Sequence, residues 1–143
     1  MKSAVTSEQS AARRGAGWTD EMMDGAMIAG ARLAGEGRVE DAKVVREFLT
    51  ALDPAHVAGH VMAAVIAERE KRWDDVVAAW GCVIAINNDH LAARAGRGRV
   101  LARLGRLAEA RRDYEVAARV DAIAVSASGR EAKAFLATNG GRR

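Results

Sequence analysis

In this 143-residue sequence, two histidines lie four residues apart, His56 and His60, and imidazole side chains at this spacing could bind a metal ion. At that spacing one face of a helix can hold a metal ion. No HExxH motif accompanies them, however, and the third histidine, His90, occupies the same position as His56 in a repeating pattern of the sequence. We therefore predict that His56 and His90 mark equivalent helix boundaries, and we expect no metal site.

The other patterns that could carry chemistry are equally weak. Cys82 is the one cysteine, and it lies next to Val83 and Ile84 in a helical pattern, which predicts a buried, inert thiol. Gly96-Arg97-Gly98 begins a GxG pattern, but it falls inside a predicted helix with no strand before it, unlike a phosphate-binding loop. Nothing pairs a nucleophile with a base. The sequence therefore predicts no enzyme activity and no cofactor.

Arginine is concentrated towards the C-terminus. Residues 91–124 carry eight Arg and four acidic side chains, whereas residues 23–56 and 57–90 each carry two more acids than bases. One predicted helix holds Arg94, Arg97, Arg99 and Arg103. Such a face is usually solvated and partly ion-paired, and that is our first interpretation. The second is that Arg99 and Arg103 bind an acidic group of a peptide.

Nucleic-acid binding is a distant third interpretation of these arginines. It needs a broad basic face together with aromatic or groove-reading groups. Aromatic residues are only 4% of the sequence, and the net charge is only +3. A nucleic acid is therefore an unlikely partner.

The elements that position these residues are predicted to be helices. Half of the sequence is hydrophobic, with few aromatic residues and a single proline, a composition that favours helix over sheet. One cysteine excludes an internal disulfide and is compatible with a reducing compartment. The longest nearly apolar run, Val57 to Ala67, is too short to span a bilayer, and no signal peptide is recognisable. We expect a cytoplasmic protein.

A 34-residue period organises the helices, in blocks 23–56, 57–90 and 91–124. Small residues recur at block positions where two helices would cross closely: Gly30, Ala42, Gly98, Ala110 and Ala117. Gly37 and Gly105 share the position where a helix would end with a positive φ. Large rings, Trp80 and Tyr114, share another position and would fill the gap to the next block. Asp53-Pro54 would end the first block.

These residues resemble the tetratricopeptide repeat, a helix–turn–helix unit with the same length as these blocks. The resemblance covers 102 of the 143 residues. It implies an all-α solenoid of three repeats with a C-terminal capping helix, forming one domain over 20–138. Helices are expected near 20–34, 39–52, 56–70, 73–86, 90–104, 107–121 and 126–138.

Individual residues predict where the first and last helices begin. Thr19 is the expected N-cap of the first helix, with Trp18 and Met23 as a hydrophobic staple. Ser128 and Glu131 have the spacing of a capping box for the last helix. Residues 1–19 should be flexible or loosely helical, and residues 139–143 should fray.

The resemblance also implies a concave groove that binds proteins or peptides, lined by the first helix of each repeat. The groove positions give an apolar, alanine-rich surface with a basic end: Met27, Ala31, Val61, Val65, Ala95, Arg99 and Arg103. Donors for an acidic chaperone tail, which some members of the family bind, are missing from the corresponding positions.

In size and layout the sequence further resembles the small bacterial chaperones of type III secretion translocators. That resemblance implies a chaperone or adaptor that holds a client segment in the groove, and homodimerisation through the N-terminal segment or first repeat. A constitutive scaffold subunit of a larger assembly is the alternative. The sequence itself identifies no client.

Overall fold

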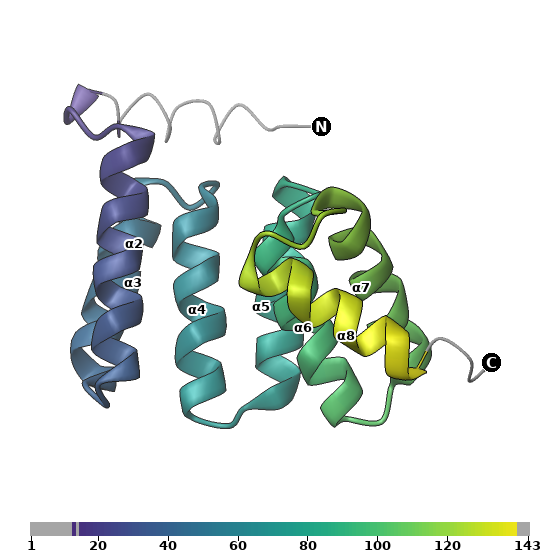
Figure 1. Ribbon diagram of the computed structural model, residues 1–143. Helices are drawn as coiled ribbons and strands as arrows, with labels where there is room; N and C mark the ends of the chain where they lie inside the picture. The colour runs from purple at the N-terminus through teal and green to yellow at the C-terminus, as the bar shows by residue number, and fades with distance from the viewer. Residues whose placement is uncertain (1–12, 14, 140–143) are drawn as a thin grey trace. The chain divides into compact units, whose positions relative to one another are not determined.

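The computed structural model describes residue 13 and residues 15–139, and the described chain contains helices and no strand (Figure 1). Its seven helices, labelled as in Figure 1, are α2 (Asp20–Gly35), α3 (Val39–Leu52), α4 (Val57–Arg69), α5 (Trp73–Ile86), α6 (Leu91–Arg103), α7 (Leu107–Val120) and α8 (Ala127–Asn139). Each predicted helix agrees with the observed one to within a residue at either end. The predicted all-α fold class is confirmed over the described residues.

The turn inside each helix pair has the same backbone conformation in all three pairs. Gly37, Lys71 and Gly105 have positive φ angles of 83°, 57° and 79°. In every case the next amide donates back to a carbonyl five residues earlier, as in a Schellman motif: Arg38 to Leu33, Arg72 to Ala67 and Arg106 to Leu101. Lys71 takes the conformation although it is not glycine. The period therefore appears in the backbone even where the sequence departs from it.

An ion pair that the sequence analysis overlooked also recurs at each turn. The arginine after the turn bonds an acid three residues later, on the first turn of the following helix. The pairs are Arg38–Asp41 at 2.8 Å, Arg72–Asp75 at 2.5 Å and Arg106–Glu109 at 2.7 Å. Because an acid in the first turn also interacts favourably with the helix dipole, each pair helps to start its helix.

The predicted N-cap of the first helix is confirmed, and so are the helix boundaries predicted at His56 and His90. The Thr19 side chain accepts a hydrogen bond from the Met22 amide. His56 Nδ1 accepts from the Ala58 amide at 3.1 Å, and His90 Nδ1 accepts from the Ala93 amide at 3.2 Å. The two histidines therefore serve as N-caps at equivalent positions, one period apart.

The predicted capping box of α8 is wrong. Ser126 is the cap, since its Oγ accepts from the Gly129 amide at 2.9 Å. Ser128 lies inside the helix, and Glu131 bonds Arg99 and Tyr114. The cap is Ser126 and not Ser128 because Ser126 Oγ donates a hydrogen bond to the Asp121 carboxylate, which holds Ser126 at the start of the helix.

The chain forms two compact units, and the boundary between them falls within α5, after Asp75. Unit 1 ends at Asp75 and unit 2 begins at Val76. Of the predicted N-terminal segment, residues 1–12 and 14 lie outside the described residues, as do residues 140–143 of the predicted tail. Arg13 is buried and pairs with Asp20 and Asp53.

The core of unit 1 is aliphatic. Its fully buried members come from α2, α3 and α4: Met23, Ala34, Ala42, Leu49, Ala58, Met62 and Ile66. Trp18 packs against this cluster, as expected of a staple. A Cβ at Gly30 would lie 2.8 Å from Met62 Cε and 2.9 Å from Val45 Cγ1. A side chain at this position would therefore displace Met62 and Val45, and glycine lets α2 lie close to both α3 and α4.

Unit 2 is built around two rings that lie on glycines of α6. Trp80 is 5% exposed, and a Cβ at Gly96 would lie 2.7 Å from its Cε2. A Cβ at Gly98 would lie 3.1 Å from Tyr114 Cε2. The GxG pattern is thus a packing feature of a helix, and Trp80 fills the space to the following repeat as predicted.

Candidate functional site

In unit 1, the predicted groove residues lie on two helices that pack against each other, α2 and α4. Met27, Ala31 and Val65 are partly buried and pack against the same core cluster. Val61 is 8% exposed and so offers little surface. The structure thus places Met27, Ala31 and Val65 as partly accessible aliphatic side chains on the same core cluster.

In unit 2, the predicted groove residues differ in accessibility. Ala95 is 1% exposed and is enclosed in a cluster with Tyr114, Ala117 and Ala132. Arg99 and Arg103 are exposed. The Arg99 Nη1 atom lies 3.1 Å from Glu131 Oε2 of α8.

Helix α8 is responsible for the burial of Ala95, since it packs against both α6 and α7. Phe135 of α8 stacks on Tyr114 with ring centroids 4.5 Å apart. The Tyr114 hydroxyl donates to Glu131 Oε1 at 2.8 Å. Burial, and then the bond to the Glu131 carboxylate, raises the pKa of Tyr114 above its ordinary value. Helix α8 therefore covers Ala95 and Tyr114 of unit 2 through both apolar and charged contacts.

The arginines of α6 are ion-paired, as first interpreted, but two of them share a buried partner that the sequence analysis overlooked. Asp113 is 1% exposed, and its carboxylate accepts from Arg94 at 2.9 Å and from Arg97 at 2.7 and 2.8 Å. The sequence did contain a signal. Asp113 lies three residues after Ala110 and four before Ala117, on the apolar face of its helix.

The thiol prediction is wrong, because Cys82 is exposed. The buried residues of α5 are Val76, Trp80, Val83 and Ile84, which share one face of the helix. Cys82 lies two residues after Trp80, on the opposite side. An apolar neighbourhood in the sequence was mistaken for a buried face.

Both histidines of the possible metal pair have other bonds. His56 Nδ1 caps α4, and its Nε2 lies 3.4 Å from Asp20 Oδ1. His60 Nε2 lies within hydrogen-bonding distance, 3.1 Å, of the Pro54 carbonyl oxygen. Over the described residues no group of three His, Cys, Asp or Glu side chains is placed to hold a metal ion. No helix within residues 15–139 has the length and apolar character to cross a membrane.

Comparison with known proteins adds information at the level of the fold. No protein-family model and no curated protein matches the sequence. Among solved structures, the chain resembles PcrH in complex with the chaperone binding region of PopB, with a TM-score of 0.69 and 16% identity over 84% of this chain and 98% of that one. It also resembles SycD, the type III secretion translocator chaperone of Yersinia enterocolitica, with a TM-score of 0.67 and 15% identity over 84% of this chain and 91% of that one. At these identities the likeness shows the fold alone: this chain shares an all-helical fold with both of those proteins.

Proposed function

We propose that this chain is a non-catalytic chaperone or adaptor that holds an extended segment of a client protein. The observation that carries the proposal is the match to nearly the whole of PcrH, which was solved with the chaperone binding region of PopB. A fold of this kind can present an extended peptide with aliphatic pockets along successive helices. A cytoplasmic location belongs to the same proposal.

The aliphatic surface of unit 1 supports this proposal. Met27, Ala31 and Val65 lie on α2 and α4 and pack against one buried core cluster. Small side chains leave room for the side chains of a client, and methionine adapts to their shape. We therefore assign aliphatic client side chains to this surface.

The charges of unit 2 support an acidic residue in the same client. The Arg99 side chain is 50% exposed, and it carries positive charge next to Glu131 on α8. Arg103 is one helical turn further along α6 and is also exposed. Ala95, which is buried, is left out of the proposed contact surface.

Site-directed photocrosslinking in the source cell tests the proposal. A photoreactive residue at Ala31 or Val65 should capture one and the same client chain. The control is Val44 of α3, which is 65% exposed but lies outside the proposed surface. Equal capture from Val44, or different proteins captured from Ala31 and Val65, would contradict a defined peptide-binding site.

A charge introduced on the surface provides the second test. Val65→Glu should abolish co-purification of the crosslinked client, because a carboxylate would meet the client's aliphatic side chains. Val44→Glu is the matched control and should leave capture unchanged. Circular dichroism of both variants should show the same helix content as the unmodified protein. Full client capture by Val65→Glu would refute the assignment of this surface.

A further inference from the structure

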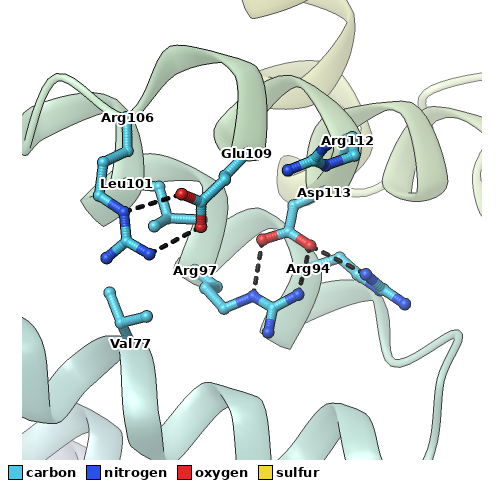
Figure 2. Close-up of a pocket in the computed structure, with 8 residues that line it drawn as sticks. All are labelled: Val77, Arg94, Arg97, Leu101, Arg106, Glu109, Arg112 and Asp113. Carbon is cyan, nitrogen blue, oxygen red and sulfur yellow. Dashed lines mark hydrogen bonds and ion pairs between the residues drawn. The ribbon is translucent and has the colours of Figure 1, made fainter.

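A cavity of about 310 Å³ lies on unit 2 and is lined by residues of α5, α6 and α7, none of which is a predicted groove residue (Figure 2). Its apolar lining comes from Val77 and Leu101. Four of the eight lining residues are arginines and two are acids: Arg94, Arg97, Arg106, Arg112, Glu109 and Asp113. The lining therefore has a formal charge of +2.

The two acids of the cavity are already bound. Asp113 accepts from Arg94 and Arg97, and Figure 2 shows its carboxylate directed at both guanidinium groups. Arg106 forms a two-pronged pair with Glu109, with Nε and Nη2 at 3.0 and 2.7 Å from its oxygens. Both carboxylates are thus hydrogen-bonded to arginines of the lining, and Glu109 also attracts Arg97 and Arg112 electrostatically.

The excess charge is located on Arg97 and Arg112. Arg94 is fully engaged, since it bonds Asn88 as well as Asp113. Arg97 uses Nε and Nη2 on Asp113, which leaves its Nη1 without a hydrogen-bond acceptor among the residues the structure describes. Arg112 has no ion pair or hydrogen bond to any residue in the described part of the chain. Donors of two guanidinium groups thus remain at one cavity.

We propose that this cavity binds a small oxyanion with two negative charges, of the phosphate or dicarboxylate class, through Arg97 and Arg112. The charge of the lining matches such a ligand, and a guanidinium donates to paired oxygens in a fixed planar geometry. A water molecule takes up roughly 30 Å³ in the liquid, so the cavity has room for the anion and some of its hydration. The low accessibility of Arg94 and Asp113 keeps the binding arginines in place.

Calorimetric titration with inorganic phosphate and with succinate, at low ionic strength, tests the proposal and distinguishes a phosphate ligand from a dicarboxylate ligand. We expect saturable binding of at least one of them to the full chain. Binding of phosphate alone would identify a tetrahedral oxyanion as the ligand class, and binding of succinate alone a dicarboxylate. Absence of saturable binding by both would overturn the proposal.

Three substitutions distinguish this site from general attraction to a basic surface. Arg112→Gln should weaken binding about tenfold, the usual loss for one hydrogen bond to a charged group. Glu109→Gln should strengthen binding, because it removes a negative charge from the lining. Arg111→Gln is the matched control and should change affinity less than twofold, since Arg111 pairs with Glu115 and does not line the cavity. Equal weakening by Arg111→Gln and Arg112→Gln would refute a defined site.

A spectroscopic measurement locates the anion independently of affinity. On titration, the Nε–Hε resonances of Arg97 and Arg112 should shift together with one saturation curve. The Arg111 resonance should stay in place. A shift confined to arginines outside the cavity would overturn the assignment even if calorimetry detected binding.

Discussion

At the residue scale, Lys71 is a residue whose type conflicts with its backbone conformation in the repeat. It adopts φ 57° at the position that glycine occupies in the other two turns. For a residue with a side chain this conformation costs roughly 1–2 kcal/mol, and glycine's greater freedom in the unfolded chain offsets part of the gain from replacing it. We expect Lys71→Gly to raise the free energy of unfolding by about 0.5–1 kcal/mol.

Urea denaturation followed by circular dichroism checks this expectation. The converse substitution, Gly105→Ala, should lower the free energy of unfolding, because alanine is strained at φ 79°. A Lys71→Gly variant that is less stable than the unmodified protein would mean that the lysine side chain contributes more than its backbone strain costs.

Tyr114 is a second residue whose chemistry is set by its surroundings, and it is the only tyrosine in the chain. Burial is the first cause of its raised pKa, followed by the bond to Glu131. The neutral phenol therefore stabilises the fold fully below its ordinary value of 10.0, and this contribution is lost as the pH rises from there through the raised pKa. Phe135→Ala should expose the ring and move the pKa back towards the ordinary value.

Absorbance of the tyrosinate during alkaline titration measures this pKa directly. Phe48→Ala is the control, because Phe48 pairs with Trp18 in unit 1 and should leave the titration unchanged. An unaltered midpoint in the Phe135→Ala variant would show that the stacking of Phe135 is not what buries Tyr114.

On the scale of elements, the loop between α7 and α8 depends on one carboxylate. Asp121 accepts from the Ser126 hydroxyl at 2.6 Å and from the amides of Ser126 and Val125 at 2.8 and 3.1 Å. The Ser126 hydroxyl bond is the largest cause of the lowered pKa of Asp121, and the amide bonds follow it. Ser126 in turn caps α8, so this carboxylate fixes the start of the helix that covers Ala95.

The lowered pKa of Asp121 predicts an acid-sensitive α8. The Asp121 carboxylate stabilises the fold fully above its ordinary pKa of 3.8, and this contribution is lost as the pH falls through the lowered pKa. Asp121→Asn should therefore destabilise the protein at neutral pH, and its deficit should shrink well below pH 3.8. Urea unfolding at several pH values measures this, with the exposed Asp24→Asn as the control. A deficit that persists unchanged in acid would assign the effect to asparagine geometry instead of charge.

Features of single helices could be predicted from the sequence, whereas features that depend on how helices pack could not. Helix bounds were predictable because turns and caps are local: a positive φ at Gly37 and Gly105, or a side-chain acceptor at Thr19 and His90, acts within a few residues. The accessibility of Ala95 was not predictable, because it depends on the packing of α8 against α6. The exposure of Cys82 required knowing which face of α5 is buried, and apolar residues occur on both faces.

For the molecule as a whole, the distribution of charge matters more than its total. The sequence suggested a basic C-terminal end, yet most of its arginines have acidic partners within unit 2. At least six of the eight Arg in residues 91–124 form ion pairs there: Arg94, Arg97, Arg99, Arg106, Arg111 and Arg119. A guanidinium that is already paired releases few counterions when it approaches a phosphate backbone. The basic segment is therefore a weak electrostatic surface.

This pairing predicts that the chain does not bind duplex DNA at physiological salt. Fluorescence anisotropy with a labelled duplex should show no saturable binding, and any association at low salt should have a shallow salt dependence, equivalent to about one or two phosphate contacts. Arg112 has no ion pair or hydrogen bond among the described residues and is the source we expect for it within residues 91–124, so Arg112→Gln should weaken it while Arg111→Gln should not. A steep dependence, equivalent to roughly six or more phosphates, would mean that the ion pairs open to bind nucleic acid. The charge of unit 2 would then be a binding surface, and the proposed anion cavity only a part of it.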